Sequence, residues 1–345
     1  MRRILEICAV QGLTAPRIPE KDGGAGLSAL MLGLMYEQLP PAVGFGVLAH
    51  EVTAARIHFD STSEQRERFL PDLIAARRIA STATTEPAGG SDTRAIATRA
   101  RRDGDHFVLD GRKMWISSIT ISDVVNVTAS VIDGETAEKR PPIGRFLVER
   151  EHSPFEARTI DTLGLKQAHL GEVVFDGCRV PAANHVGTAG DAGKVLTLSW
   201  LINRPVIGLM AVNMAQQALD AALTYAADRT QFGKPLAQFQ LIQELLADIS
   251  AAVTTSRLVC YYALSAIDRG ERANHVTAMA KRHALAACQR AISLAMEVHG
   301  AMGIAVETGL EQLYRDVRML PIPDGTNQIL TLIEGRELTG VPAYR

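Results

Sequence analysis

Two segments in the first half of the chain carry residue types suited to binding a flat, polar ligand. Residues 85–92 read TEPAGGSD, and their glycines leave backbone N–H groups free to bind a ring edge or a phosphate. Residues 113–117 read KMWIS, and strand alternation would place Trp115 and Ser117 on one face, with an aromatic ring beside a hydroxyl. Taken alone, the first segment is more often a surface loop, and the second is as often a strand with a core tryptophan.

Two segments in the second half of the chain add charged groups. Residues 228–235 read DRTQFGKP, where a helix ends, Arg229 can pair with a phosphate and Phe232 can stack on a ring. Residues 323–328 read PDGTNQ, an aspartate-bearing turn against the start of a helix. Each segment is as readily explained by an ordinary helix end or N-cap, so the four segments are informative only together.

The elements that must position these segments change in character along the chain. Residues 25–80 have helical spacing of apolar residues, and residues 60–63 (DSTS) offer a helix N-cap. Residues 95–180 hold short runs rich in Val, Ile, Thr and Phe between turn signals, which predicts an antiparallel sheet or barrel. From residue 194 the pattern is helical again, and Gly270 marks the break between two long helices.

These patterns predict an α+β fold class with three parts. We expect an N-terminal helical domain over residues 1–80, a central antiparallel β domain (barrel or sandwich) over residues 81–187, and a C-terminal four-helix bundle over residues 188–345. Strands are expected at residues 106–110, 113–116, 124–131, 143–148 and 173–175.

Composition limits the classes of function. Of 345 residues, 47% are hydrophobic and 21% are charged, as in ordinary globular proteins, and a formal net charge of -2 argues against a nucleic-acid partner. Four dispersed cysteines and nine histidines show no metal-ligand spacing, so no metal site is expected. No G-x-G-x-x-G follows a predicted strand, so a Rossmann dinucleotide site is not supported. Cysteine usage and the lack of a signal-peptide pattern favour a cytoplasmic location.

One stretch, residues 195–214, is apolar enough to resemble a membrane span. Asn203, Arg204 and Pro205 stand at its centre, where an arginine would be costly in a bilayer. We therefore expect a buried helix and no membrane span.

Taken together, the four segments resemble the acyl-CoA dehydrogenase family of flavoproteins in both order and spacing, with residues 314–316 (YRD) preceding the DGT of the last segment. The resemblance covers nearly the whole chain, although the chain is expected to be shorter at its N-terminus than typical members. It implies FAD bound between the β domain and the C-terminal bundle. Because members share each FAD between two subunits, it also implies a homodimer or homotetramer.

The resemblance implies FAD-binding roles for residues from both halves of the chain. Those in residues 229–232 and 297–301 would reach the FAD of a neighbouring subunit. Two positions depart from the family, since Glu297 stands where Gln is usual and Ala301 where Gly is usual. The implied FAD-binding residues are Thr85, Gly90, Ser91, Trp115, Ile116, Ser117, Arg229, Gln231, Phe232, Gln240, Glu297, Gly300, Ala301, Thr326 and Gln328.

The implied reaction has a base remove the α-proton of an acyl thioester while flavin N5 accepts a β-hydride. Asp324 holds the family's base position, where most members have the longer Glu, and the alternative base position is Asn203, which cannot act as a base. Bulky side chains near the acyl chain predict a small acyl group. The implied substrate-binding residues are Phe45, Ser91, Trp200, Arg204 and Gly325.

The sequence therefore predicts FAD-dependent α,β-dehydrogenation of a small acyl thioester carried by CoA or by an acyl carrier protein. An electron-transfer flavoprotein or another acceptor would take the electrons. Three alternatives remain on the same fold: a flavin-dependent ene-thioester reductase, a monooxygenase or oxidase, and an inactive FAD-binding scaffold.

Overall fold

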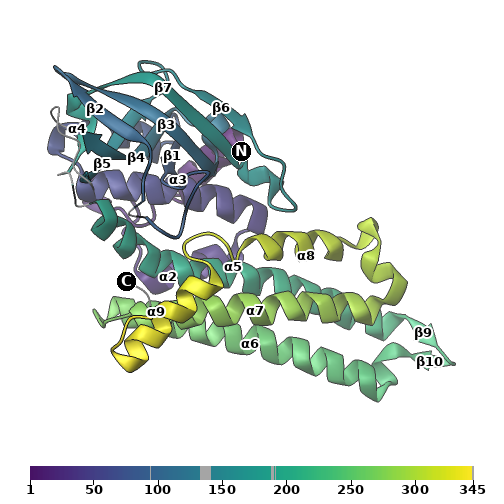
Figure 1. Ribbon diagram of the computed structural model, residues 1–345. Helices are drawn as coiled ribbons and strands as arrows, with labels where there is room; N and C mark the ends of the chain where they lie inside the picture. The colour runs from purple at the N-terminus through teal and green to yellow at the C-terminus, as the bar shows by residue number, and fades with distance from the viewer. Residues whose placement is uncertain (94, 133–140, 188–189, 191, 344–345) are drawn as a thin grey trace. The chain divides into compact units, whose positions relative to one another are not determined.

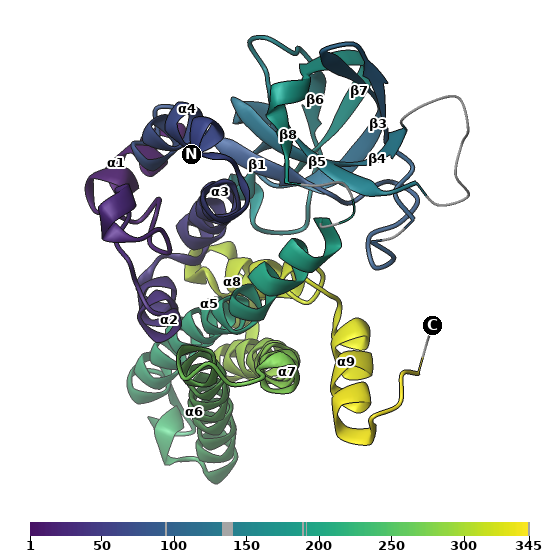
Figure 2. The same cartoon turned by 90° about the vertical axis from the view of Figure 1, so that its left-hand side faces the viewer.

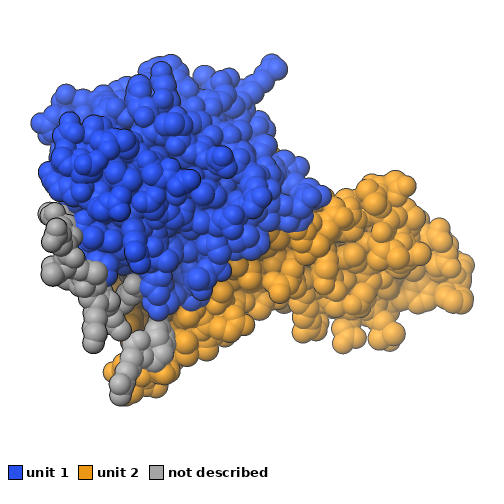
Figure 3. Space-filling view, turned by 45° about the horizontal axis from the view of Figure 1, so that its top comes forward, with its two compact units in different colours: residues 1–27, 42–162, 166–199 blue, residues 28–41, 163–165, 200–345 orange. Residues whose placement is uncertain are grey.

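The chain forms two compact units (Figure 3). The computed structural model describes residues 1–343 except 94, 133–140, 188–189 and 191, and for residues 192–198 it describes the backbone alone. Unit 1 holds residues 1–27, 42–162 and 166–199, and unit 2 holds residues 28–41, 163–165 and 200–345.

Among the helices of unit 1, α4 has clear capping chemistry at its first turn. Helix α4 starts in a capping box: the Thr62 hydroxyl accepts the backbone N–H of Gln65, and the Gln65 side chain accepts that of Thr62. This confirms the N-cap expected within residues 60–63. The helices are α1 (Arg2–Val10), α3 (Pro41–Asp60) and α4 (Ser63–Ile74), with short 3₁₀ helices at Glu20–Asp22, Ile119–Ile121, Lys166–Ala168 and Ala182–Asn184.

The β domain is one eight-stranded sheet in the order β6-β7-β3-β2-β4-β5-β8, with β1 also paired to β4 (Figure 1). Most neighbours are antiparallel, but β1 and β2 both run parallel to β4, because the chain reverses once before β3 and again after it. The central β domain is confirmed, with these two parallel pairs added. Its strands are β1 (Ala80–Ala83), β2 (Arg99–Asp103), β3 (His106–Ile116), β4 (Val124–Ile132), β5 (Ile143–Glu149), β6 (Glu156–Thr159), β7 (Gly171–Pro181) and β8 (His185–Val186).

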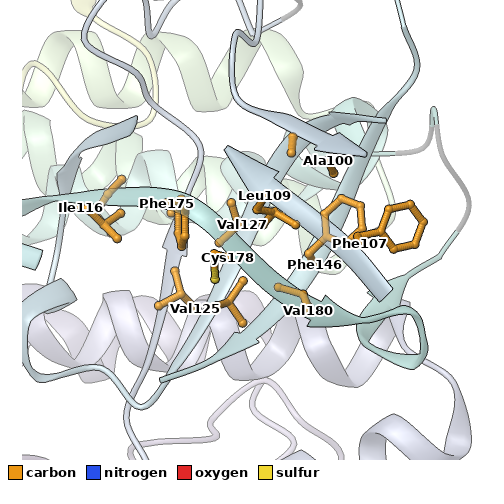
Figure 4. Packing of buried hydrophobic residues seen from close by; sticks show 14 of the residues in the cluster. Ala100, Phe107, Leu109, Ile116, Val125, Val127, Phe146, Phe175, Cys178 and Val180 are labelled. Carbon is orange, nitrogen blue, oxygen red and sulfur yellow. The ribbon is translucent and has the colours of Figure 1, made fainter. Parts of the chain in front are cut away.

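Strand β4 is buried on both faces, which gives unit 1 two cores. On one face the alternating Val125 and Val127 join side chains of β3, β5 and β7, including Phe107 and Phe146 (Figure 4). On the other face Val124 packs in a cluster with Phe69 of α4 and residues of α3, β1 and β5. Helices α3 and α4 therefore pack against the face of the sheet opposite to the one that faces the barrel-like core.

Strand β3 breaks its alternation at Trp115. Its register with β7 shifts between Lys113 and Ile116, and Trp115 has φ 64°. The strand ends at Ile116, so Ser117 lies beyond it. The expectation that alternation places Trp115 and Ser117 on one face is therefore wrong, because a bulge buries Lys113 and Ile116 and leaves Trp115 half exposed.

Unit 2 is helical. Helices α6 and α7 lie side by side in both views (Figures 1 and 2), and Gly270, with φ 71°, lies in the connection between them, which confirms the expected break. Helix α7 also packs on α8 and α9, and α2 packs on α6. The expected C-terminal helical domain is confirmed, but unit 2 also takes in α2, which was expected in the N-terminal domain, and α5 begins within unit 1. The helices of unit 2 are α2 (Ala29–Gln38), α5 (Ala192–Asp228) from residue 200 onward, α6 (Gln240–Asp268), α7 (Asn274–His299), α8 (Leu310–Met319) and α9 (Asn327–Thr339), with 3₁₀ helices at Leu236–Gln238, Gly300–Ile304 and Val306–Thr308.

Within the described residues, one helix is long and apolar enough to cross a membrane by length and composition. It is the part of α5 from Ser199 to Asp228, and 67% of its most apolar window is buried inside the protein. Asn203 and Arg204 are among the buried residues. The burial agrees with the buried helix expected from the sequence.

Candidate active site

In unit 1, the glycine-rich loop after β1 is tied to the end of β3. The backbone N–H of Met114 donates to the carbonyl of Thr85 at 2.9 Å. Within the loop, Glu86 and Gly89 exchange two backbone hydrogen bonds of 3.0 and 3.1 Å. A Cβ atom on Gly90 would lie 3.1 Å from Thr85 Cγ2, so the loop folds back on its own first residue. The structure thus brings Thr85 and Gly90 together with the residues that flank Trp115.

A buried ion pair holds this loop against the strand. The Lys113 side chain is fully buried, and its Nζ donates to Glu86 Oε1 at 2.8 Å and to the carbonyl of Thr84 at 3.1 Å. Glu86 also accepts the backbone N–H groups of Ala97 and Thr98, at 2.7 and 2.8 Å. Five polar groups are satisfied in one network, as a buried charge requires.

The pKa shifts of the pair report how well each charge is compensated. Burial lowers the pKa of Lys113 to about 8, against the opposing effect of Glu86. Burial also raises the pKa of Glu86, but the hydrogen bonds from Lys113 and the backbone outweigh it, and the net shift is downward. The carboxylate is therefore better compensated than the ammonium.

The sequence-predicted residues of unit 1 present both apolar and polar groups. Trp115 is half exposed, and Gly90 and Ser91 are exposed near the half-buried Thr85. Ile116 is buried and Ser117 is half-buried, with its carbonyl accepting from Ser81 at 2.7 Å.

A second group of sequence-predicted residues lies where α5 ends. A hairpin of β9 (Thr230–Gln231) and β10 (Lys234–Pro235) follows Asp228, and its two-residue turn has φ 50° at Phe232 and 79° at Gly233. This turn lifts Phe232 away from the chain, leaving it 93% exposed. Arg229, Gln231 and Gln240, the first residue of α6, are exposed as well.

The aspartate-bearing turn lies between α8 and α9. Asp324 has φ 52° and Gly325 has φ 97°, both in the left-handed region. The N-cap of α9 is Thr326, whose hydroxyl accepts the N–H of Ile329, so Asp324 is not the capping residue. Its side chain instead meets Asn203 of α5, whose Nδ2 donates to Asp324 Oδ2 at 2.9 Å.

A buried lysine donates hydrogen bonds to the backbone of the same turn. Lys281 of α7 is fully buried, and its Nζ donates to the carbonyls of Pro323 and, at 2.7 Å, Gly325. Burial lowers the pKa of Lys281 to about 7, Asp324 raises it, and the positive charge of the buried Arg204 lowers it further. The sequence-predicted Asp324, Arg204 and Gly325 are thus brought together by unit 2.

The remaining sequence-predicted residues of unit 2 lie at helix ends. Glu297 is exposed on the last turn of α7, and Gly300 and Ala301 are exposed just after it. Gln328 is exposed on the first turn of α9. Trp200 is half-buried on α5 and, in unit 1, Phe45 is half-buried on α3.

Sequence reasoning missed the two buried lysines. A lysine in a helix is ordinarily solvated, yet Lys281 stands on the same helical face as the apolar Ala278, Leu285 and Cys288. That placement is the signal that could have identified it. Lys113 lies inside a segment that the sequence had already singled out, but its partner Glu86 is distant in sequence and nothing local links them.

Among the residues that the structure describes, no group of three or more His, Cys, Asp or Glu side chains is placed to hold a metal ion. The four cysteines are free and buried.

Family models match nearly the whole chain. The N-terminal, middle and C-terminal domains of acyl-CoA dehydrogenase match residues 1–77, 81–178 and 194–339, respectively.

Curated relatives match over similar lengths. The chain is 31% identical over 332 residues to a probable acyl-CoA dehydrogenase, YngJ, of Bacillus subtilis, covering 95% of this chain and 87% of the relative. It is 32% identical over 345 residues to a mitochondrial isobutyryl-CoA dehydrogenase of Dictyostelium discoideum, covering 98% and 82%.

Solved structures share the fold. Butyryl-CoA dehydrogenase of Megasphaera elsdenii aligns with a TM-score of 0.90 at 28% identity, covering 97% of this chain and 89% of its own. A glutaryl-CoA dehydrogenase of Mycobacterium smegmatis in complex with FADH2 gives 0.92 at 26%, covering 100% and 88%. The prolyl acyl carrier protein oxidase AnaB gives 0.90 at 27%, covering 98% and 90%.

Proposed function

Because the chain belongs to the acyl-CoA dehydrogenase family of oxidoreductases that act on CH–CH groups, we propose that it dehydrogenates a small acyl thioester between its α and β carbons. One observation carries the proposal. A half-buried carboxylate, Asp324, stands in a left-handed turn with its Oδ2 hydrogen-bonded to Asn203, which suits a side chain used as a base.

The cofactor is FAD, and the residues present fit it. The half-exposed Trp115 suits a flat heteroaromatic ring, and the glycine-rich loop tied to the neighbouring Met114 carries the hydroxyls of Thr85 and Ser91. The exposed Arg229 and Phe232 suit a phosphate and an aromatic ring. The residues that would hold FAD are Thr85, Gly90, Ser91, Trp115, Ile116, Ser117, Thr326 and Gln328 and, for a neighbouring subunit's FAD, Arg229, Gln231, Phe232, Gln240, Glu297, Gly300 and Ala301.

The chemistry of the chain's own residues is a proton transfer. Asp324 takes the α-proton of the thioester, forming a carboxyl O–H bond as the α C–H bond breaks. The electron pair left on the α-carbon forms the new double bond as the β C–H bond breaks. FAD, when bound, supplies the acceptor for the hydride that leaves the β-carbon.

The size of the acyl group follows from the bulky side chains proposed to line its pocket, Phe45 and Trp200. Two large aromatic groups leave little length for an acyl chain, so we expect short thioesters to react faster than a dodecanoyl thioester. The carrier is CoA or an acyl carrier protein, since both kinds of thioester occur in the names of similar proteins. An electron-transfer flavoprotein or another acceptor would reoxidise the flavin, in the cytoplasm.

We also infer a homo-oligomer, a dimer or a tetramer. Unit 2 exposes large apolar side chains over the hairpin, α6 and the segment after α7, and such surface is ordinarily covered by another protein surface. These side chains include Phe232, Leu241, Leu258, Tyr262, Met302, Ile304 and Val306. Light scattering of the yellow holoprotein tests this, and a strict monomer would refute it.

The decisive experiment is anaerobic reduction of the bound flavin by a panel of thioesters. The panel holds butyryl-, isobutyryl-, glutaryl- and dodecanoyl-CoA, together with butyryl and prolyl groups on an acyl carrier protein. Bleaching of the flavin by a short thioester supports the proposal. Reduction of an enoyl thioester by pre-reduced enzyme, without the forward reaction, would indicate a reductase. A flavin that no thioester reduces would indicate a monooxygenase or an inactive scaffold.

A further inference from the structure

We propose that Asn203 and Lys281 are positioning residues that allow an aspartate to act as the α-proton base. Asn203 orients the Asp324 carboxylate through a hydrogen bond, and Lys281 stabilises the backbone of the turn that contains Asp324. This inference rests on the proposed function, because it assigns both residues to the proton-transfer step of that reaction.

An aspartate at this position needs a well-defined orientation. It is one methylene shorter than the family's usual glutamate, which reduces its reach by about 1.5 Å. A misplacement of about 1 Å at a reacting group can cost about 10²-fold in rate. A short base therefore depends on neighbours that restrict both its side chain and its backbone.

Asn203 restricts the side chain. Its Nδ2 lies 2.9 Å from Asp324 Oδ2, an ordinary length for a hydrogen bond to a carboxylate. Asn203 is 3% exposed and belongs to the long helix α5, so packing of the helix sets its position. Engaging Oδ2 limits rotation of the carboxylate, and in this proposal Oδ1 is the oxygen that takes the α-proton.

Lys281 restricts the backbone. A φ of 52° is uncommon for a residue other than glycine, and although aspartate tolerates it better than most, contacts around the turn are needed to hold it there. The Lys281 ammonium donates to the carbonyls on both sides of Asp324, those of Pro323 and Gly325. Two peptide groups are thus tied to one buried point on α7, and the residue between them is the proposed base.

The two family base positions are joined directly in this chain. The usual base position carries the shorter acid, Asp324, and the alternative base position carries an amide, Asn203. The amide donates to the carboxylate, so a residue that cannot act as a base is placed to orient the one that can.

The test of Asn203 compares Asn203→Leu, which keeps the volume and removes the donor, with Asn203→Ala, which cannot clash. We expect flavin reduction by the fastest thioester of the panel to slow by about 10- to 10²-fold with little change in KM. Exchange of the thioester α-proton into D2O, followed by NMR, should slow in parallel, because that readout needs the base and no hydride transfer. In an Asp324→Asn background, Asn203→Leu should change neither rate further.

Asn213→Leu is the matched control. Asn213 lies on the same helix, and its amide donates at 2.6 Å to the carbonyl of Glu37. The Asn213→Leu variant should lose stability as Asn203→Leu does, but its rates of flavin reduction and α-proton exchange should stay at the wild-type level. If Asn203→Leu and Asn203→Ala exchange and reduce at wild-type rates while Asp324→Asn is inactive, the positioning role is wrong and the base stands. If Asp324→Asn is also unaffected, or no thioester reacts, the proposed function itself fails.

The test of Lys281 uses Lys281→Met and Lys281→Arg. We expect Met to slow both proton exchange and flavin reduction by about 10-fold or more, and Arg, which keeps N–H donors, to recover part of the loss. Backbone amide exchange around residues 323–326 should accelerate in Lys281→Met. Thr277→Val, one turn earlier on the same helix and equally buried, is the control. Wild-type proton exchange in a folded Lys281→Met protein would overturn the role of Lys281.

Discussion

Two fully buried lysines, one in each unit, stabilise segments that carry predicted site residues, and they do so in different ways. Lys113 of unit 1 faces a carboxylate, Glu86, at 2.8 Å, and the pair joins a loop to a strand. Lys281 of unit 2 faces two backbone carbonyls, with Arg204 and Asp324 as its charged neighbours. In unit 1 the buried ammonium of Lys113 is paired with a carboxylate. In unit 2 the buried ammonium of Lys281 has no carboxylate hydrogen-bond partner among the described residues and donates to the backbone of the turn at residues 323–325.

Burial lowers the pKa of both lysines, to about 8 for Lys113 and to about 7 for Lys281. Glu86 opposes the shift at Lys113, whereas at Lys281 the opposing effect of Asp324 is countered by the positive charge of Arg204. We infer that the unit 1 arrangement serves stability of a binding surface, and that the unit 2 arrangement serves the geometry of one residue.

The largest expected effect separates chemistry from binding. Asp324→Asn keeps the size of the side chain and removes the base, so flavin reduction by the fastest thioester should fall by a factor on the order of 10² to 10⁴. FAD content should stay at wild-type level, because Asp324 is not among the residues proposed to hold FAD. Anaerobic stopped-flow absorbance measures the rate, and the visible spectrum measures the FAD content. Reduction near the wild-type rate would show that the base is elsewhere.

How far the sequence predicts this arrangement differs between the two regions. Pro323 and Gly325 flank Asp324, and that local pattern was enough to predict the turn. The strand that carries Trp115 was predicted as well, but its bulge was not, because the register shift depends on pairing with β7. Periodicity assumes a regular strand, and a single inserted residue reverses which side chains point outward.

The supporting residues were beyond local patterns. Lys281 is 43 positions from Asp324 and Asn203 is 121 positions from it. Contacts of this kind arise only after helices pack, so neither a motif nor a propensity records them. The resemblance to a family supplied candidate residues, whereas the structure supplied the hydrogen bonds among them.

The next prediction tests the ion pair of unit 1. Lys113→Met leaves Glu86 buried without its cation, and breaking a buried pair from one side ordinarily costs about 3–5 kcal/mol in the free energy of unfolding. The double variant Lys113→Met/Glu86→Gln should recover part of that loss, since it removes both charges. Lys281→Met should cost less than Lys113→Met, because its abandoned partners are neutral carbonyls. Urea unfolding of the three variants measures the order, and an equal cost at both lysines would remove the contrast.

A third buried nitrogen-containing side chain, His50 of α3, extends the comparison to a group that is neutral at pH 7. Its Nδ1 accepts the N–H of Ala80 at 3.1 Å and its Nε2 donates to the carbonyl of Leu73 at 2.9 Å, so the neutral ring is fully bonded. Burial lowers the pKa of His50 to about 4.

Because the pKa of His50 is lower in the folded protein than in the unfolded chain, His50 makes the protein less stable in acid. Between about pH 6.5 and pH 4 the unfolded chain binds a proton that the folded protein does not, so stability falls as the pH falls through this window. From pH 7 to pH 4 the loss is about 3 kcal/mol at roughly 1.4 kcal/mol per pH unit. His50→Gln should be less stable at pH 7 but should lose about that much less on acidification. A parallel loss in wild type and variant would contradict the assignment.

The smallest expected effect sharpens the comparison between the two lysines themselves. Each has a pKa below that of an unfolded lysine, so above its folded pKa the unfolded chain binds more protons than the folded protein. The free energy of unfolding therefore rises with pH. The rise begins near pH 7 for Lys281 and near pH 8 for Lys113, and it ends near the unfolded pKa of 10.5. Between pH 7 and 8 the rise is about 1 kcal/mol for Lys281 and about a third of that for Lys113. Unfolding free energies of wild type, Lys281→Met and Lys113→Met at both pH values isolate the two contributions, because each Met variant lacks one of them. If the two differences change equally, the carbonyl site and the ion pair compensate the charge to the same degree, and the contrast between the units would not extend to their electrostatics.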